Sequence, residues 1–328
     1  MNIIKLNAVL GRNLKGSLGS ADQIFIAEAS MHVKGIVPFL IAGSFWSLRT
    51  GLAQPDPLPR DPIDRGFAQA ERLPGKIENK LPGSDLVAVL AEKSPSEREE
   101  LIYAILERGH FPDFLRNMRP VTIRERGHAL TFWVMPDYVA IGSDEDYVLM
   151  PMNFITAKRL ARTWGMALPT AKMVDAIYQQ AERTVWPKTM SPGPKMGSMD
   201  YIEQHNNWIL GQRYLYPDPT VLQAGHKKDI VLSRRLYTKP DRIAIYGWHN
   251  IRGGEPIQPL STWHGERYVD YSHGVRMIGP WVQLDGQTLA LRDVLRDDRL
   301  AGLLSSEGTL DIDRLLRDGA PYSLAHNH

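Results

Sequence analysis

The chain has 328 residues, of which 43% are hydrophobic and 23% are charged, and its formal net charge at pH 7 is +2. This composition is ordinary for a globular protein, and the nearly balanced charge gives no indication of a nucleic-acid or membrane-surface partner. The chain contains no cysteine, which excludes disulfides, thiolate metal sites and a cysteine nucleophile.

The N-terminal region has the order of segments that is typical of a secretory signal peptide, starting at Met31. A short basic start is followed by an apolar run over residues 36–48 and by small residues that lead up to Ala53. The run is about 13 residues long, shorter than the roughly 20 that cross a bilayer. We therefore expect a signal peptide over residues 31–53, with residues 1–30 as an upstream extension that is not native. The alternative is a core helix near the N-terminus.

Export would release a mature chain without a transmembrane segment, either in the periplasm or outside the cell. Residues 54–83 would open this chain. They hold six prolines and many charged residues, so they bury little apolar surface and are predicted to be an extended linker. Globular sequence then runs over residues 84–328, which we expect to form a single main domain.

The clearest local signal of a helix lies between Ser94 and Gly109. Ser94 can cap a helix, Pro95 suits the first helical position, and Glu97 completes a capping box. Gly109 suits the stop at the C-terminal end. These residues together predict a helix that begins at Pro95 and ends just before Gly109.

The remaining elements come in blocks of strands and blocks of helices. Alternating hydrophobicity predicts two hairpins, over residues 121–135 and 138–152. Further helices are predicted at residues 153–164, 170–183, 199–212, 291–304 and 311–317, and further strands at 229–233, 242–249, 267–278 and 281–291. Within the last of these, Asp285 and Gly286 are a strong signal for a hairpin turn. Because strands and helices do not alternate, we expect an α+β fold with a mainly antiparallel sheet, a helical hairpin and flanking helices.

The helical hairpin over residues 153–183 has a second interpretation. Ala161 and Gly165 have the spacing found in helix-turn-helix units, and nearby cations could meet phosphates: Lys158, Arg159, Arg162 and Lys172. The domain as a whole is not strongly basic, so nucleic-acid binding is not the favoured interpretation. An ordinary helical hairpin that packs on the sheet is preferred.

Histidines are concentrated in the second half of the domain. Five of the ten lie between residues 205 and 273, and these four are predicted at strand ends, in loops or within a strand: His226, His249, His264 and His273. A rigid sheet often presents reactive side chains at such positions. Each histidine by itself could equally be a hydrogen-bonded structural residue, so the indication of a site comes from the grouping.

One hypothesis for this grouping is a metal site. His226, Asp229 and His249 could hold a divalent ion such as zinc and leave one position open for water. Over these few residues the pattern resembles the zinc-binding pattern of D-alanyl-D-alanine peptidases, in which a longer, glycine-containing stretch separates the first histidine from the aspartate. The activity of that family is therefore not carried over to this chain.

A second hypothesis is acid–base catalysis without a metal. His264 or His273 would act as the base, and Asp270 would orient it. Lys228 and Arg276 would bind an anionic group of the substrate.

The predicted strand over residues 267–278 limits how its polar side chains can cooperate. Asp270, Ser272 and Arg276 would share one face of the strand, while His273 would point to the other. Ser272 is a third possible reactive group, a nucleophile, but it would then need a base from elsewhere. A salt bridge from Asp270 to Arg276, or to a cation on a neighbouring strand, would explain these residues without catalysis.

Tryptophans indicate a class of substrate. Trp248 and Trp263 each adjoin one of these histidines, and an aromatic ring beside polar groups suits stacking against a sugar. We therefore expect an exported bacterial hydrolase that acts on a cell-envelope or extracellular polymer, with peptidoglycan peptide or glycan favoured. A non-catalytic module that binds cell-wall glycan is the alternative, and a helix-turn-helix DNA-binding protein is third.

Overall fold

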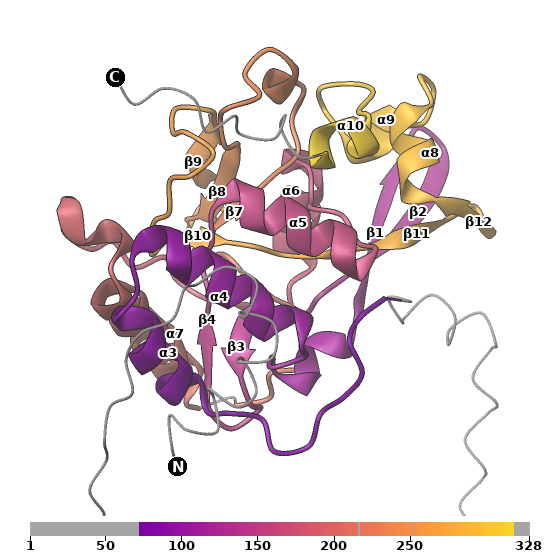
Figure 1. The fold of residues 1–328 in the computed structure, drawn as a ribbon. Coiled ribbons are helices and arrows are strands. Elements are labelled where there is room, and N and C mark those ends of the chain that lie inside the picture. Colours follow the sequence, from indigo (N-terminus) through magenta and orange to yellow (C-terminus); the bar gives the residue numbers. More distant parts are fainter. Residues whose placement is uncertain (1–71, 216, 251, 318–328) are drawn as a thin grey trace, which may run out of the picture. The chain divides into compact units, whose positions relative to one another are not determined.

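The computed structural model describes residues 72–215, 217–250 and 252–317, which all belong to one compact unit, Asp61–His328 (Figure 1). The predicted upstream extension and signal peptide lie outside the described residues, as does the predicted linker up to residue 71.

The last part of the predicted linker, residues 72–82, is described and lies against the domain. Lys80 Nζ forms an ion pair with Asp113 Oδ1 at 2.7 Å. Arg116 Nη1 donates a hydrogen bond to the carbonyl of Pro74 at 2.7 Å. These contacts bring the N-terminal end of the described chain onto the surface of the domain.

The first described helices are α3 (Gly83–Ala91) and α4 (Pro95–Glu107). The capping box predicted at the start of α4 is confirmed. The Ser94 side chain accepts a hydrogen bond from the Glu97 backbone, and the Glu97 side chain accepts one from the Ser94 backbone at 3.0 Å. The helix ends as predicted, two residues before Gly109.

In the part of the chain that the structure describes, the first large sheet has four strands in the order β1-β2-β11-β12, with all neighbours antiparallel. The strands are β1 (Arg119–Glu125), β2 (His128–Val134), β11 (Ile278–Leu284) and β12 (Gln287–Ala290). The predicted hairpins β1–β2 and β11–β12 are confirmed. The second one turns at Asp285 and Gly286, whose φ angles of 50° and 85° match the tight turns that join twisted strands.

The second large sheet carries most of the predicted site residues. Its described strands, in the order β10-β7-β8-β9, are β7 (Lys228–Ile230), β8 (Ile245–His249), β9 (Pro256–Ser261) and β10 (His273–Gly274). The pairs β7–β8 and β8–β9 are antiparallel, whereas β10 runs parallel to β7.

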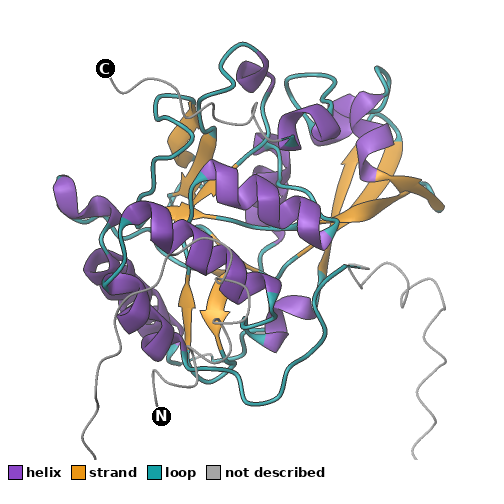
Figure 2. Cartoon of the chain, in the orientation of Figure 1, coloured by secondary structure: helices purple, strands orange, loops and turns teal. Residues whose placement is uncertain are grey.

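Two small sheets complete the described strands. β3 (Ala140–Gly142) and β4 (Tyr147–Leu149) form the predicted antiparallel hairpin, and β5 (Arg183–Thr184) pairs in parallel with β6 (Gln223–Ala224). The predicted α+β fold with mainly antiparallel strands is confirmed (Figure 2).

The central helices follow the predicted order: α5 (Phe154–Trp164), α6 (Ala171–Gln180) and α7 (Met199–Arg213). Helix α6 contacts β1, β6 and β8, so it joins the two large sheets. Helix α5 instead contacts α4 and α10. Short 3-10 helices are η1 (Asp113–Arg116), η2 (Pro194–Gly197) and η3 (Arg234–Tyr237).

Three short helices lie near the C-terminus: α8 (Leu291–Arg296), α9 (Ala301–Leu304) and α10 (Ile312–Leu316). Helices α8 and α9 contact the first sheet, whereas α10 contacts α5 and α8. The single helix expected at residues 291–304 is therefore two helices. Asp297 Oδ1 accepts a hydrogen bond from the Arg299 backbone at 2.8 Å, which closes a turn between them. No described helix is both long and apolar enough to cross a membrane.

Residues 267–278 do not form the single strand that the sequence predicts. Only β10 is paired within this stretch, and β11 begins at its end. Asp270 interrupts the strand, because its Oδ1 accepts hydrogen bonds from the Ser272 backbone and hydroxyl at 2.8 Å and 2.9 Å, and its carbonyl accepts one from His273 N at 3.0 Å. Such local bonds favour a turn over a strand. The predicted pairing of Asp270 with Arg276 on one strand face is therefore wrong.

Candidate functional site

The three side chains predicted as catalytic lie together beside the parallel pair of β7 and β10. The register of this pair places His273 next to Lys228. The connection from β9 to β10 supplies His264, Tyr268 and Asp270. These five residues are named here the His273 group.

Aromatic contacts hold the two histidines of the His273 group around one tyrosine. His264 is stacked on Tyr268, with 3.9 Å between the ring centroids and 11° between the ring planes. The edge of the same tyrosine meets His273, with 5.7 Å between centroids and 67° between planes. Tyr268 was not predicted as a site residue, although its position between the two histidines in the sequence could have indicated it.

Asp270 is the carboxylate of the His273 group, and it is held from several sides. Besides the two bonds from Ser272, it forms a side-chain hydrogen bond with Tyr268. Its Oδ2 lies 4.0 Å from Lys228 Nζ, on the neighbouring strand. Asp270 therefore pairs with a cation from a neighbouring strand, as one of the sequence-based interpretations allows.

His273 is the least satisfied member of the group. It is 1% exposed, yet neither ring nitrogen has a hydrogen-bond partner among the described residues. Burial lowers the pKa of His273 to about 3, although the negative charge of Asp270 opposes this shift. The ring is therefore neutral at pH 7 and offers one N–H donor and one acceptor. Buried polar atoms normally have partners, so this ring is suited to bind a ligand or water.

A buried lysine next to this group was missed in the sequence. Lys227 is 1% exposed, and its Nζ donates a hydrogen bond to the carbonyl of Tyr271 at 2.6 Å. Burial lowers the pKa of Lys227 to about 7, against the opposing charges of Asp270 and Asp137. No local pattern marks this burial, because Lys227 precedes both the predicted strand over residues 229–233 and the observed β7.

A second buried group is centred on Asp137, which the sequence did not indicate. Asp137 Oδ2 forms an ion pair with Arg213 Nη1 at 2.7 Å, and its Oδ1 lies 3.1 Å from His226 Nε2. Burial alone would raise the pKa of Asp137, but the charge of Arg213 and the bond with His226 hold it well below its usual range. Burial lowers the pKa of His226 to about 4, so this imidazole is neutral at pH 7.

Arg276 lies inside the protein and holds backbone segments together. It is 0% exposed, and its guanidinium donates to the carbonyls of Met135, Pro136 and Gln223 at 3.1, 3.3 and 2.7 Å. Its Nε lies 3.8 Å from Asp229 Oδ1. These contacts occupy the guanidinium within the protein, and none of them supports the predicted role of Arg276 in substrate binding.

His249 belongs to a third group. Its Nε2 lies 3.1 Å from Asp175 Oδ1, and its ring is stacked on Tyr178 with 4.2 Å between centroids. The hydroxyl of Tyr246 donates to the same Asp175 carboxylate at 2.8 Å. His249 is thus oriented by a carboxylate that comes from helix α6, not by the other predicted ligands.

The three predicted metal ligands do not fit a common ion. His226 Nε2 lies 2.9 Å from Arg213 Nη2, a cation that repels a metal at this nitrogen. Asp229 instead accepts a hydrogen bond from the Tyr138 hydroxyl at 2.8 Å, and burial raises the pKa of Asp229 to about 6. Among the described residues, no three histidine, aspartate or glutamate side chains are grouped closely enough to hold a metal ion.

The two tryptophans predicted to bind substrate differ in accessibility. Trp248 is 5% exposed, its Nε1 donates to the carbonyl of His226 at 3.2 Å, and the ammonium of Lys228 lies over its ring. Trp263, next to His264, is 80% exposed. Only Trp263 of this pair therefore presents a ring face on which a sugar could stack.

The His273 group combines a neutral imidazole, a carboxylate and an ammonium within one small region. This combination can move a proton and stabilise a developing negative charge.

Comparison of the chain with protein-family models, with curated proteins and with solved structures finds no match.

Proposed function

We propose that this protein is an exported bacterial hydrolase of a cell-envelope or extracellular polymer, with peptidoglycan peptide or glycan favoured, and that the His273 group is its acid–base site. The observation that carries this proposal is the buried imidazole of His273, which lies next to Asp270 and Lys228. Neither of its ring nitrogens has a hydrogen-bond partner among the described residues. Export is supported by the signal-peptide pattern over residues 31–53.

The proposed chemistry needs no metal ion. His273 takes a proton from water while the water oxygen forms a bond to the electrophilic carbon of the substrate. The imidazolium then gives a proton to the leaving nitrogen or oxygen as the scissile bond breaks. The negative charge of Asp270 favours the imidazolium, and the Lys228 ammonium stabilises charge that develops on the substrate oxygen.

The test is hydrolysis of dye-labelled peptidoglycan sacculi by the purified full chain. His273→Gln should lower the rate of dye release at least about 100-fold, because removing a general acid–base residue typically costs 100- to 10,000-fold. New amino groups in the products would indicate peptide cleavage, and new reducing ends would indicate glycan cleavage.

His128→Gln is the matched control for this test. His128 is a half-buried imidazole that pairs with a carboxylate, Asp285, at 2.6 Å, and it lies in the β1–β2 hairpin, outside the His273 group. The His128→Gln substitution should leave the rate of dye release unchanged. Equal dye release by the wild type and His273→Gln, with both proteins folded by circular dichroism, would remove His273 from the site.

Binding of cell-wall glycan without cleavage is the second candidate function. It is supported by exposed tryptophan rings: Trp186, Trp208 and Trp263 are 53%, 48% and 80% exposed. Sedimentation of the protein with sacculi, without release of fragments and with loss of binding in Trp263→Ala, would favour this function over hydrolysis.

DNA binding remains the third interpretation. Three of the cations that could meet phosphates, Lys158, Arg159 and Lys172, each form an ion pair with a glutamate. These pairs weaken the case, because a phosphate would have to displace a carboxylate at each position.

A further inference from the structure

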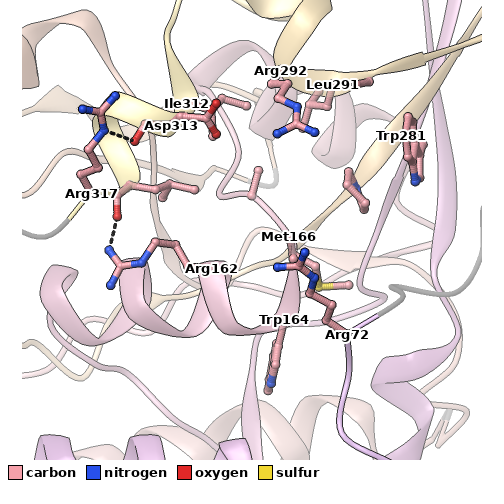
Figure 3. A pocket seen from close by; sticks show the side chains of 15 residues that line it. Arg72, Arg162, Trp164, Met166, Trp281, Leu291, Arg292, Ile312, Asp313 and Arg317 are labelled. Carbon is pink, nitrogen blue, oxygen red and sulfur yellow. Dashed lines mark hydrogen bonds between the residues drawn. The ribbon is translucent and has the colours of Figure 1, made fainter.

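A pocket of about 500 Å³ lies between the end of α5, the strands β11 and β12, and the helices α8 and α10 (Figure 3). Its size is within the range of pockets that hold small organic ligands. Apolar side chains form much of its lining: Trp164, Met166, Leu291, Ile312 and Leu316. None of the His273 group is among the described residues that line it.

The charged side chains around this pocket are mostly arginines. Among the described residues that line it, four are arginines and a single one, Asp313, is acidic. The Asp313 carboxylate already forms an ion pair with Arg296, which is not a lining residue, at 2.8 Å. The pocket therefore carries a positive charge that is not neutralised by its own carboxylate.

Two of the arginines approach the pocket from opposite sides. Arg72, from the N-terminal segment, and Arg292, from α8, point toward the same space in Figure 3. Arg317 lies on another side, and its Nε donates to the carbonyl of Asp313 at 3.3 Å. All three are exposed, so their guanidinium groups are accessible to a ligand.

The backbone around the pocket is shaped to hold Arg72. Gly165 ends α5 with a left-handed φ of 65°, and a Cβ at this position would lie 3.0 Å from Arg72 Cδ. The absent side chain leaves room for the stem of Arg72, which packs across the helix end.

We propose that this pocket binds an organic anion with an apolar body, such as a monomeric acyl carboxylate. The apolar lining removes the body of the ligand from water, and the guanidinium groups form charge-assisted hydrogen bonds with its anionic head. This site is independent of the proposed hydrolase function, because it shares no residue with the His273 group.

Titration calorimetry of the full chain tests the proposal with three probes below their aggregation range. Decanoate carries both parts of the ligand, 1-decanol only the apolar part, and acetate only the charge. Decanoate should bind one-to-one, at least about tenfold more tightly than either of the other probes. Arg292→Gln and Arg317→Gln should each weaken decanoate binding about tenfold, in line with the loss of one charge-assisted hydrogen bond.

Arg299→Gln is the matched control, because Arg299 is an exposed arginine that pairs with Asp297 and does not line the pocket. It should bind decanoate like the wild type. Equal affinity for decanoate and decanol, equal losses in Arg292→Gln and Arg299→Gln, or no decanoate binding by the wild type would each overturn the proposal. Circular dichroism confirms that each variant is folded.

Discussion

Replacing Gly274 with alanine tests how tightly the strand that carries His273 is packed. A Cβ at residue 274 would lie 2.5 Å from Tyr138 Cδ1 and 2.8 Å from Lys227 Cβ. The tyrosine ring is not free to move away, because its hydroxyl donates to Asp229 at 2.8 Å and the guanidinium of Arg276 lies 4.1 Å from its centroid. Close approach of this buried ring, rather than of a ligand, is what requires a glycine here.

Gly274→Ala should lower the free energy of unfolding by about 3 kcal/mol, the upper end of the range for overpacked interiors, because both neighbours are held in place. For a domain of this size that loss lowers Tm by roughly 6–12 °C. Thermal denaturation of the full chain, followed by circular dichroism, measures the shift. The variant should also hydrolyse sacculi more slowly, if the proposed function holds, since His273 is its neighbour.

Gly279→Ala is the matched control. Gly279 is also buried in a strand, but the nearest atom to a Cβ there, the carbonyl oxygen of Trp133, is 3.5 Å away, an ordinary contact. Its Tm should stay close to that of the wild type. If Gly274→Ala and Gly279→Ala unfold at the same temperature, the reasoning from the tyrosine contact is refuted.

Three further changes concern stability. Ser94→Ala removes the capping bonds of α4 and should lower the free energy of unfolding in urea by about 1 kcal/mol. Asp137→Asn leaves Arg213 as a buried cation without its carboxylate and should cost about 3–5 kcal/mol in the same measurement. Burial raises the pKa of Asp229 from 3.8 to about 6, so the folded protein keeps a proton that the unfolded chain releases. The protonated Asp229 therefore contributes its full stabilisation, on the order of 3 kcal/mol, below about pH 4, and this contribution is lost as the pH rises through 6. The free energy of unfolding of Asp229→Asn should not show this dependence on pH.

Each of these expectations has an outcome that contradicts it. Wild-type stability in Ser94→Ala would mean that water replaces the cap. A loss below about 1 kcal/mol in Asp137→Asn would mean that Arg213 finds another partner or reaches solvent. If the difference in unfolding free energy between the wild type and Asp229→Asn stays constant from pH 4 to pH 6, the pKa of Asp229 is not raised.

Local signals in the sequence were sufficient for much of the fold. The capping box at Ser94 and Glu97 and the hairpin turn at Asp285 and Gly286 both lie where they were predicted. Each depends on bonds between residues a few positions apart, so a short stretch of sequence contains all the partners. The order of such elements also determined the α+β class.

The candidate site was predicted only in part. The grouping of His264, in a predicted loop, with His273, in a predicted strand, indicated a site, and the structure brings both onto Tyr268. The strand face predicted to be shared by Asp270 and Arg276 was wrong, because Asp270 closes a turn where the strand was expected. An alternation rule holds only while the chain stays extended, and a side chain that bonds its own backbone ends that state.

Which buried charges pair with one another was decided by the tertiary structure alone. Asp137 and His226 are 89 residues apart in the chain, and Arg276 bonds to carbonyls 140 and 141 residues before it. A charge can stay in the interior only where partners from distant segments meet it. The residues adjacent to a buried charge in the sequence do not predict its partner, because the pair forms only when the two sheets and the helices between them pack.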